Sequence, residues 1–229
     1  MPRQTSRGRC FFCGGTFASS GMTRHLMSCK GRPSDVATPT RRRSSQRVFH
    51  LVVSGRYAPM YWLHLEASST ASLEAVDELL RDTWLECCGH LSAFRLGDRR
   101  FSTPSPFGDW SEDESSSIAL GKLLAVGQTL EYEYDFGSTT ELTIRVVGER
   151  PGRPPEALKI VARNDPPEIA CTGCAEGVAT MLCSECNMEG EGWLCDACAA
   201  AHKRGETELT PIPNSPRAGV CGYTGFELS

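Results

Sequence analysis

The spacing of the cysteines constrains this sequence more than any other feature. Of its 229 residues 12 are cysteines, and ten of these stand in or near two clusters, one toward each end. The first residues, MPRQTSRGRCFF, lack the apolar core of a signal peptide, and no stretch is apolar over the roughly 18 residues that a membrane span needs. We therefore expect a cytoplasmic protein with no membrane contact, in which Cys-x2-Cys pairs mark metal sites rather than disulfides.

The first cluster predicts a Cys3His zinc finger over residues 1–30. Its ligands are Cys10, Cys13, His25 and Cys29. Cys10 and Cys13 suit a tight knuckle, and His25 and Cys29 lie one helical turn apart, so they share a helix face. Three thiolates and one imidazole complete a tetrahedral Zn2+. Without a metal, a segment this short has no means of folding.

The second cluster predicts a two-zinc module over residues 166–229. Three Cys-x2-Cys pairs are separated by eight residues each, and the predicted ligands are Cys171, Cys174, Cys183, Cys186, Cys195, Cys198, His202 and Cys221. The equal spacing favours an interleaved cross-brace, with the first and third pairs on one ion and the second pair joining His202 and Cys221 on the other. Sequential pairing of the first two pairs is the alternative. With the finger, three zinc ions are expected.

The two remaining cysteines, Cys87 and Cys88, are adjacent at the expected end of a helix. Because adjacent side chains there do not easily chelate one ion, we interpret them as small buried hydrophobic residues. His50, His64 and His90 are dispersed among expected strands and a helix end. We interpret them as structural or surface histidines.

Charge is divided unevenly along the chain. The net charge is -4, yet residues 1–47 carry ten basic side chains and one acidic one. We expect nucleic-acid contacts from Arg3, Arg7, Arg9, Arg24, Lys30, Arg41, Arg42 and Arg43. Residues 31–47, rich in Pro, Ser, Thr and Arg, read as a flexible basic linker. The acidic remainder of the chain is poorly suited to an anionic partner.

Residues 48–165 have the pattern of an α+β domain, with an antiparallel sheet and one main helix. Strands are expected at 48–53, 61–67, 93–96 and 99–101, followed by a hairpin of 129–136 and 141–149. Apolar residues at helical spacing predict a helix over 73–87, with Ser72 as its N-cap. An acidic loop over 108–117 and a short helical segment over 118–124 complete the pattern.

The segment YEYDFGSTTELTIRVVGE, together with VFHLVVSGRYAPMYWLHLEA, resembles the plasmid open-reading-frame-three-like family, also labelled insertion-element passenger TnpR proteins. The resemblance covers about residues 46–165 and is carried best by Tyr134, Asp135, Phe136 and Gly137. The family usually continues with Asp, a variable residue and Trp, where this chain has Ser138, Thr139 and Thr140. The flanks resemble a zinc finger and a B-box-like cross-brace.

Three functions compete. We favour a non-enzymatic zinc protein that binds nucleic acid through the basic N-terminal segment, associated with a mobile element or a prokaryotic regulatory or defence complex. The alternative is a protein-interaction adaptor that uses residues 166–229. An enzyme with a pocket beside Tyr132, Tyr134, Asp135 and Glu141 is less favoured, because both metal clusters look full and a catalytic zinc needs an open position.

Overall fold

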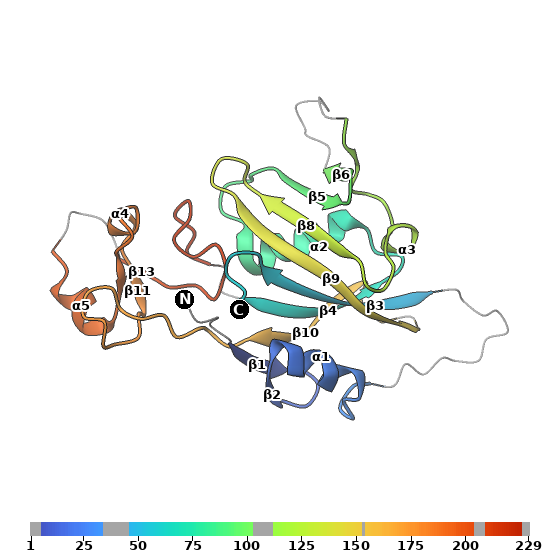
Figure 1. Cartoon of the computed structure of the whole chain (residues 1–229), viewed down its shortest axis with the longest axis horizontal. Helices are drawn as coiled ribbons and strands as arrows, with labels where there is room; N and C mark the ends of the chain where they lie inside the picture. The colour runs from blue at the N-terminus through green and yellow to red at the C-terminus, as the bar shows by residue number, and fades with distance from the viewer. Residues whose placement is uncertain (1–5, 34–45, 103–111, 153, 204–208, 226–229) are drawn as a thin grey trace.

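The computed structural model describes residues 6–33, 46–102, 112–152, 154–203 and 209–225 (Figure 1). Its elements are β1 (Arg7–Cys10), β2 (Thr16–Ala18), α1 (Ser19–Met27), β3 (Arg47–Gly55), β4 (Trp62–Ser68), α2 (Leu73–Leu80), the π-helical turn η1 (Arg81–Leu85), β5 (Ser92–Leu96), β6 (Arg99–Ser102), β7 (Glu114–Ser115), α3 (Leu120–Leu123), β8 (Thr129–Tyr134), β9 (Thr140–Pro151), β10 (Leu158–Asn164), β11 (Met181–Leu182), α4 (Ser184–Asn187), β12 (Trp193–Leu194), α5 (Asp196–Ala201) and β13 (Thr210–Pro211).

A ten-stranded sheet dominates the fold, in the order β2-β1-β10-β4-β3-β9-β8-β5-β6-β7. Neighbouring strands are antiparallel except for β6 and β7, which pair in parallel. The sheet is larger than the single sheet expected from residues 48–165. It contains β7 and β10, which were not predicted, and the finger strands β1 and β2 extend it past β10. The molecule is thus a sheet-rich fold with a few short helices.

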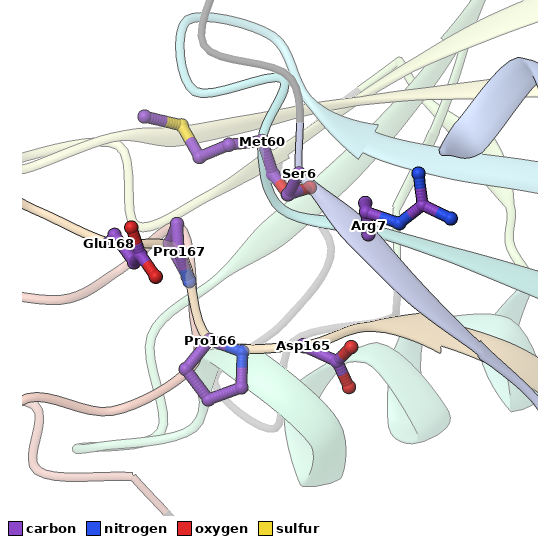
Figure 2. Close-up of a pocket in the computed structure, with 7 residues that line it drawn as sticks. All are labelled: Ser6, Arg7, Met60, Asp165, Pro166, Pro167 and Glu168. Atoms are coloured by element: carbon purple, nitrogen blue, oxygen red, sulfur yellow. The ribbon is translucent and has the colours of Figure 1, made fainter. Parts of the chain in front are cut away.

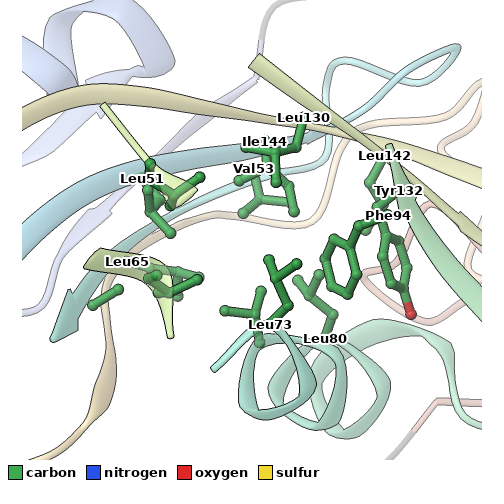
Figure 3. Packing of buried hydrophobic residues seen from close by; sticks show 14 of the residues in the cluster. Leu51, Val53, Leu65, Leu73, Leu80, Phe94, Leu130, Tyr132, Leu142 and Ile144 are labelled. Carbon is green, nitrogen blue, oxygen red and sulfur yellow. The ribbon is translucent and has the colours of Figure 1, made fainter. Parts of the chain in front are cut away.

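The main core lies between one face of this sheet and helix α2 (Figure 3). Strand residues alternate between faces, so Leu51 and Val53 of β3 and Leu65 of β4 point toward Leu73 and Leu80 of the helix. The Ser72 hydroxyl accepts a hydrogen bond from the Ala75 N–H at 3.1 Å, which confirms the expected N-cap. The observed α-helix is shorter than the predicted range of 73–87, because a π-helical turn follows Leu80 and the chain becomes extended at Glu86.

The finger packs on the opposite face of the sheet. Trp62 of β4, whose neighbour Leu63 faces the main core, is 1% exposed beneath Met22 and Leu26 of α1. At the seam, β1 runs so close to β10 that a Cβ on Gly8 would lie 2.1 Å from the Arg163 carbonyl oxygen. Only glycine fits there. The finger therefore extends the sheet and forms a second hydrophobic core with it, and is not an independent module.

Residues 166–229 do not form one module, as was expected, but two parts. A small sheet, β12-β11-β13, forms around the cysteine pairs. The chain then returns to the central sheet, where the Ser215 hydroxyl donates to the Trp84 carbonyl oxygen at 2.7 Å. Arg163 donates to the Asn214 carbonyl oxygen at 2.6 Å, and Asn164 donates to the Asn214 side chain at 2.8 Å. Residues 214–223 thus pack mainly against the central fold, and Gly219 also accepts a hydrogen bond from the Asn187 side chain of the cysteine module at 2.9 Å.

The docking of the finger generates a stability prediction. Leu26 is 0% exposed between the finger and the sheet, whereas its neighbour Met27 is 61% exposed. Leu26→Ala should lower the free energy of unfolding by about 2–4 kcal/mol through lost burial and the cavity left behind. The matched variant Met27→Ala should change it by less than about 0.5 kcal/mol. Denaturant unfolding measures both, and similar values for the two variants would contradict the docked arrangement.

Candidate metal centres

The structure brings the four predicted finger ligands together. The ligand atoms of Cys10, Cys13, His25 and Cys29 all lie within 4.8 Å of one another. The Cys10 and Cys29 sulfurs are 3.8 Å apart, and the Cys13 sulfur lies 3.3 Å from His25 Nε2. Tetrahedral Zn2+ with Zn–S bonds of about 2.3 Å holds two sulfurs about 3.8 Å apart, and a sulfur and a nitrogen about 3.5 Å apart. The geometry is therefore that of a metal site.

Local structure explains how these ligands converge. Cys10 ends β1, and the Gly14 N–H donates to the Cys10 carbonyl oxygen at 2.8 Å, which closes the knuckle. His25 lies on α1, and Phe17 stacks on its ring at 4.3 Å between centroids. Cys29 follows the helix end. Burial raises the pKa of the Cys10 thiol to about 11.

The C-terminal cysteines fall into two further groups. The first and third pairs converge, as Cys171, Cys174, Cys195 and Cys198, with the Cys174 and Cys195 sulfurs 3.8 Å apart. The second pair meets His202, whose Nε2 lies 3.6 Å from the Cys186 sulfur. This is the interleaved arrangement and not the sequential one. Pairing of β11 with β12 brings the outer pairs together across the middle one.

In the first of these two groups the backbone stabilises the thiolate of Cys171, whereas hydrogen bonds with Cys171 and the other cysteines raise the pKa of the Cys198 thiol to about 12. A hydrogen bond from the Cys195 backbone N–H, the largest contribution, lowers the pKa of the Cys171 thiol to about 6. A Cβ on Gly177 would lie 2.9 Å from that of Cys195, so glycine is needed for the loop to approach this closely. Backbone donors aimed at sulfur favour the deprotonated form that binds metal.

Cys221 does not lie where it was predicted. It was expected beside Cys183, Cys186 and His202, which form a group of three among the residues that the structure describes. Residues 204–208, which follow that histidine, lie outside the described ranges. Cys221 instead joins Cys87, Cys88 and His90 in a fourth group. The spacing of the C-terminal cysteines gave no sign of this partner, because it lies in another part of the chain.

The interpretation of Cys87 and Cys88 as buried hydrophobic residues is wrong for Cys88, which is exposed, and holds only in part for Cys87, which is half-buried against the main core. Both are members of the fourth group. All 12 cysteines of the chain thus belong to one of four Cys/His groups positioned to bind a metal ion. A useful signal in the sequence was the Cys-Cys-x-His run itself, which carries three ligand-type residues within four positions.

The other two histidines form a buried pair instead. His50 Nε2 lies 2.8 Å from His64 Nδ1 beneath the finger. Burial, with Arg32 nearby, lowers the pKa of His50 to about 4. Burial, together with His50 itself, lowers the pKa of His64 to about 3. Both rings are neutral at pH 7 and act as structural residues, as expected.

The predicted nucleic-acid contacts are placed in part. Arg7, Arg9, Arg24 and Lys30 are exposed on the finger, whereas Arg3, Arg41, Arg42 and Arg43 lie outside the described residues. Two further cations of the N-terminal segment serve the fold. Arg32 pairs with the buried Glu66, which also accepts from Arg150 at 2.9 Å, and Arg47 pairs with Glu149 at 2.9 Å.

The hairpin residues weighed as an enzyme pocket are occupied by contacts within the fold. The Tyr132 hydroxyl donates to Asp77 at 2.6 Å, and the Tyr134 hydroxyl donates to Glu86 at 3.2 Å. Asp135 accepts from Arg217 at 2.7 Å. These groups stabilise the link between helix α2, the hairpin and the C-terminal segment.

A cavity of about 440 Å³ lies elsewhere, beside the start of β1 (Figure 2). Ser6, Arg7, Met60 and the segment 165–168 line it. The Ser6 hydroxyl donates to the Met60 carbonyl oxygen and accepts from the Trp62 indole N–H at 2.8 Å. Because its hydroxyl is engaged in this way, Ser6 is not poised as a nucleophile.

Comparison with known proteins assigns no function to this chain. No family model and no curated protein matches the chain. A solved structure that resembles it is described as a protein of unknown function, MM3350, from Methanosarcina mazei Go1. The two share 14% identity and a TM-score of 0.44, over 52% of this chain and 68% of that one. Within the described residues, no helix is long and apolar enough to cross a membrane.

The interleaved pairing can be tested by counting metal ions in double variants. Cys174→Ser with Cys195→Ser removes two ligands of one ion and should lose one equivalent of metal. Cys174→Ser with Cys183→Ser strikes both ions of the module and should lose two. Elemental analysis of the purified proteins measures the difference, with Ser184→Ala as a control that retains every ion. Sequential pairing predicts the reverse order of losses.

Proposed function

We propose that this chain is a non-enzymatic zinc protein that binds nucleic acid through its finger and the basic segment around it. The observation that carries the proposal is the set of four exposed cations on the finger: Arg7, Arg9, Arg24 and Lys30. Zinc is the proposed ion, because sets of thiolates with imidazole at tetrahedral spacing suit it best among divalent metals. Each group then serves to hold its segment folded.

The mode of binding follows from how the finger is docked. The apolar face of α1 is buried on the sheet through Met22 and Leu26, so only its outer face is available to a ligand. That face carries Arg24 in the last turn, with Lys30 shortly beyond the helix end. Lysine and arginine so placed suit phosphate contacts, which fix affinity and salt dependence without reading sequence.

The internal ion pairs sharpen the proposal. Arg32 and Arg47 lie in the same basic segment but hold Glu66 and Glu149. Arg9 lies 3.7 Å from Asp165, and both side chains are largely exposed, so this pair is weak and screened. The cations assigned to nucleic acid are therefore the exposed ones of the finger, together with the Arg3 and Arg41–Arg43 side chains predicted from sequence.

Removing two exposed finger cations tests this function. Arg24→Ala with Lys30→Ala should weaken binding to a mixed-sequence duplex and reduce the slope of log affinity against log salt by about 1.8, since each phosphate contact contributes about 0.9. The matched control, Arg95→Ala with Lys122→Ala, removes the same charge from exposed positions of the central domain. A salt titration by fluorescence anisotropy measures both slopes.

The outcome also separates the two leading functions. Equal slopes for the finger variant, the control and the wild type would contradict nucleic-acid binding by the finger. Point variants are preferable to deleting residues 1–46, because that deletion would uncover Trp62 and Val161 and break the pairing of β1 with β10.

A protein-interaction adaptor is the second candidate. Met188 follows α4 with 89% of its surface exposed, and Val178 is 49% exposed in the same module. Exposed acidic residues lie close to Met188 in the sequence, among them Glu185 and Glu191. Such a surface suits a partner that is basic and apolar. Association with a mobile element or a prokaryotic regulatory or defence complex is proposed only from the resemblance over residues 46–165.

A further inference from the structure

The fourth Cys/His group has the geometry of the other three, although its members are distant in sequence. Its ligand atoms, from Cys87, Cys88, His90 and Cys221, all lie within 4.8 Å of one another. The Cys221 sulfur is 3.4 Å from His90 Nε2, a residue 131 positions away. The corresponding sulfur-to-nitrogen distances are 3.3 Å in the finger and 3.6 Å in the C-terminal module. All three match the spacing of about 3.5 Å across a tetrahedral zinc ion.

Backbone structure brings the adjacent cysteines to one ion. The chain leaves its helical turn at Glu86, so Cys87 and Cys88 lie beyond the helix and not on it. Gly89 has a φ of 71°, and its N–H donates to the Glu86 carboxylate at 2.5 Å. The resulting turn returns His90 to the two sulfurs. The objection that adjacent helical side chains diverge therefore does not apply here.

A disulfide explains this group less well than a metal. Three sulfurs converge, so a disulfide leaves one thiol and the imidazole without a role. The donor set, three cysteines and one histidine, is the same as that of the finger. Thiolates and imidazole are the ligands that zinc prefers.

A buried arginine contacts one ligand of this group. Arg217 is fully buried, four residues before Cys221. Its guanidinium donates to Asp135 at 2.7 Å and to the Cys87 sulfur at 3.4 Å. Asp135 in turn lies 3.6 Å from His90 Nε2. The arginine therefore links one sulfur ligand to the carboxylate beside the histidine ligand. Partner groups of this kind, which orient and balance the ligands, are typical of metal centres.

We propose that Cys87, Cys88, His90 and Cys221 bind a zinc ion that fastens the C-terminal segment to the central domain. The ion links the turn after η1 to the segment that carries Ser215 and Arg217, over the hairpin corner at Asp135. The site differs from the finger and the cross-brace because its ligands come from two separate parts of the chain. It does not depend on nucleic-acid binding, so the two proposals can fail independently.

The test uses the full chain, purified with zinc under reducing conditions and without a metal-binding tag. Cys221→Ser should lose one equivalent of zinc relative to the wild type. Cys221→His should keep it, because a Cys2His2 set also binds zinc. Far-UV circular dichroism checks that the variants remain folded, which the exposed position of Cys221 favours.

Limited trypsin digestion measures how firmly the C-terminal segment is held, through the rate of cleavage after Arg217. The buried Arg217 is protected, and cleavage after it releases a peptide that begins at Ala218. Cys221→Ser should release this peptide at least about tenfold faster than the wild type, since cleavage follows the population of the opened segment. Cys221→His should restore protection. Cys13→Ser, which removes a ligand of the finger, should lose zinc but leave Arg217 protected.

Three results would overturn the proposal. One is a zinc content unchanged in Cys221→Ser. Another is loss of the ion with no faster cleavage after Arg217, which would deny the fastening role. The third is a disulfide among Cys87, Cys88 and Cys221, detected by mass spectrometry of the reduced preparation.

Discussion

Strand β10 is the element through which the parts of this molecule are joined. It pairs with β4 of the central sheet on one side and with β1 of the finger on the other. Its last residues, Arg163 and Asn164, bind Asn214 of the returning C-terminal segment. Because all these contacts fall on seven residues, the position of the finger and that of the C-terminal segment both depend on the register of one strand.

The metal groups act at a smaller scale. The finger and the cross-brace have too little apolar surface to fold as isolated units, and a metal ion bound at each group would supply the missing stabilisation. The finger adds to this by burying Met22 and Leu26 against Trp62. Metal binding and hydrophobic docking would thus be coupled in the finger, whereas the cross-brace has only three very short strands besides its metal groups.

Charge is organised by the same packing. Buried acids are matched by arginines, Glu66 by Arg32 and Arg150, and Asp135 by Arg217, because an unpaired buried charge is costly. The arginines in these pairs are not available to contact an anionic ligand. The basic character of the N-terminal segment, read from sequence as one property, therefore divides into cations that hold the fold and cations that face solvent.

Short-range patterns in the sequence determined much of this protein. Local spacing predicted the ligands of the finger, the interleaved pairs, the Ser72 cap and the central hairpin, since each depends on residues that a turn, a helix or a hairpin brings together. Tertiary structure alone decided that β1 would pair with β10 and that Cys221 would meet Cys87, Cys88 and His90. Those contacts join residues more than a hundred positions apart, where the path of the chain and not the spacing of ligands sets which side chains meet.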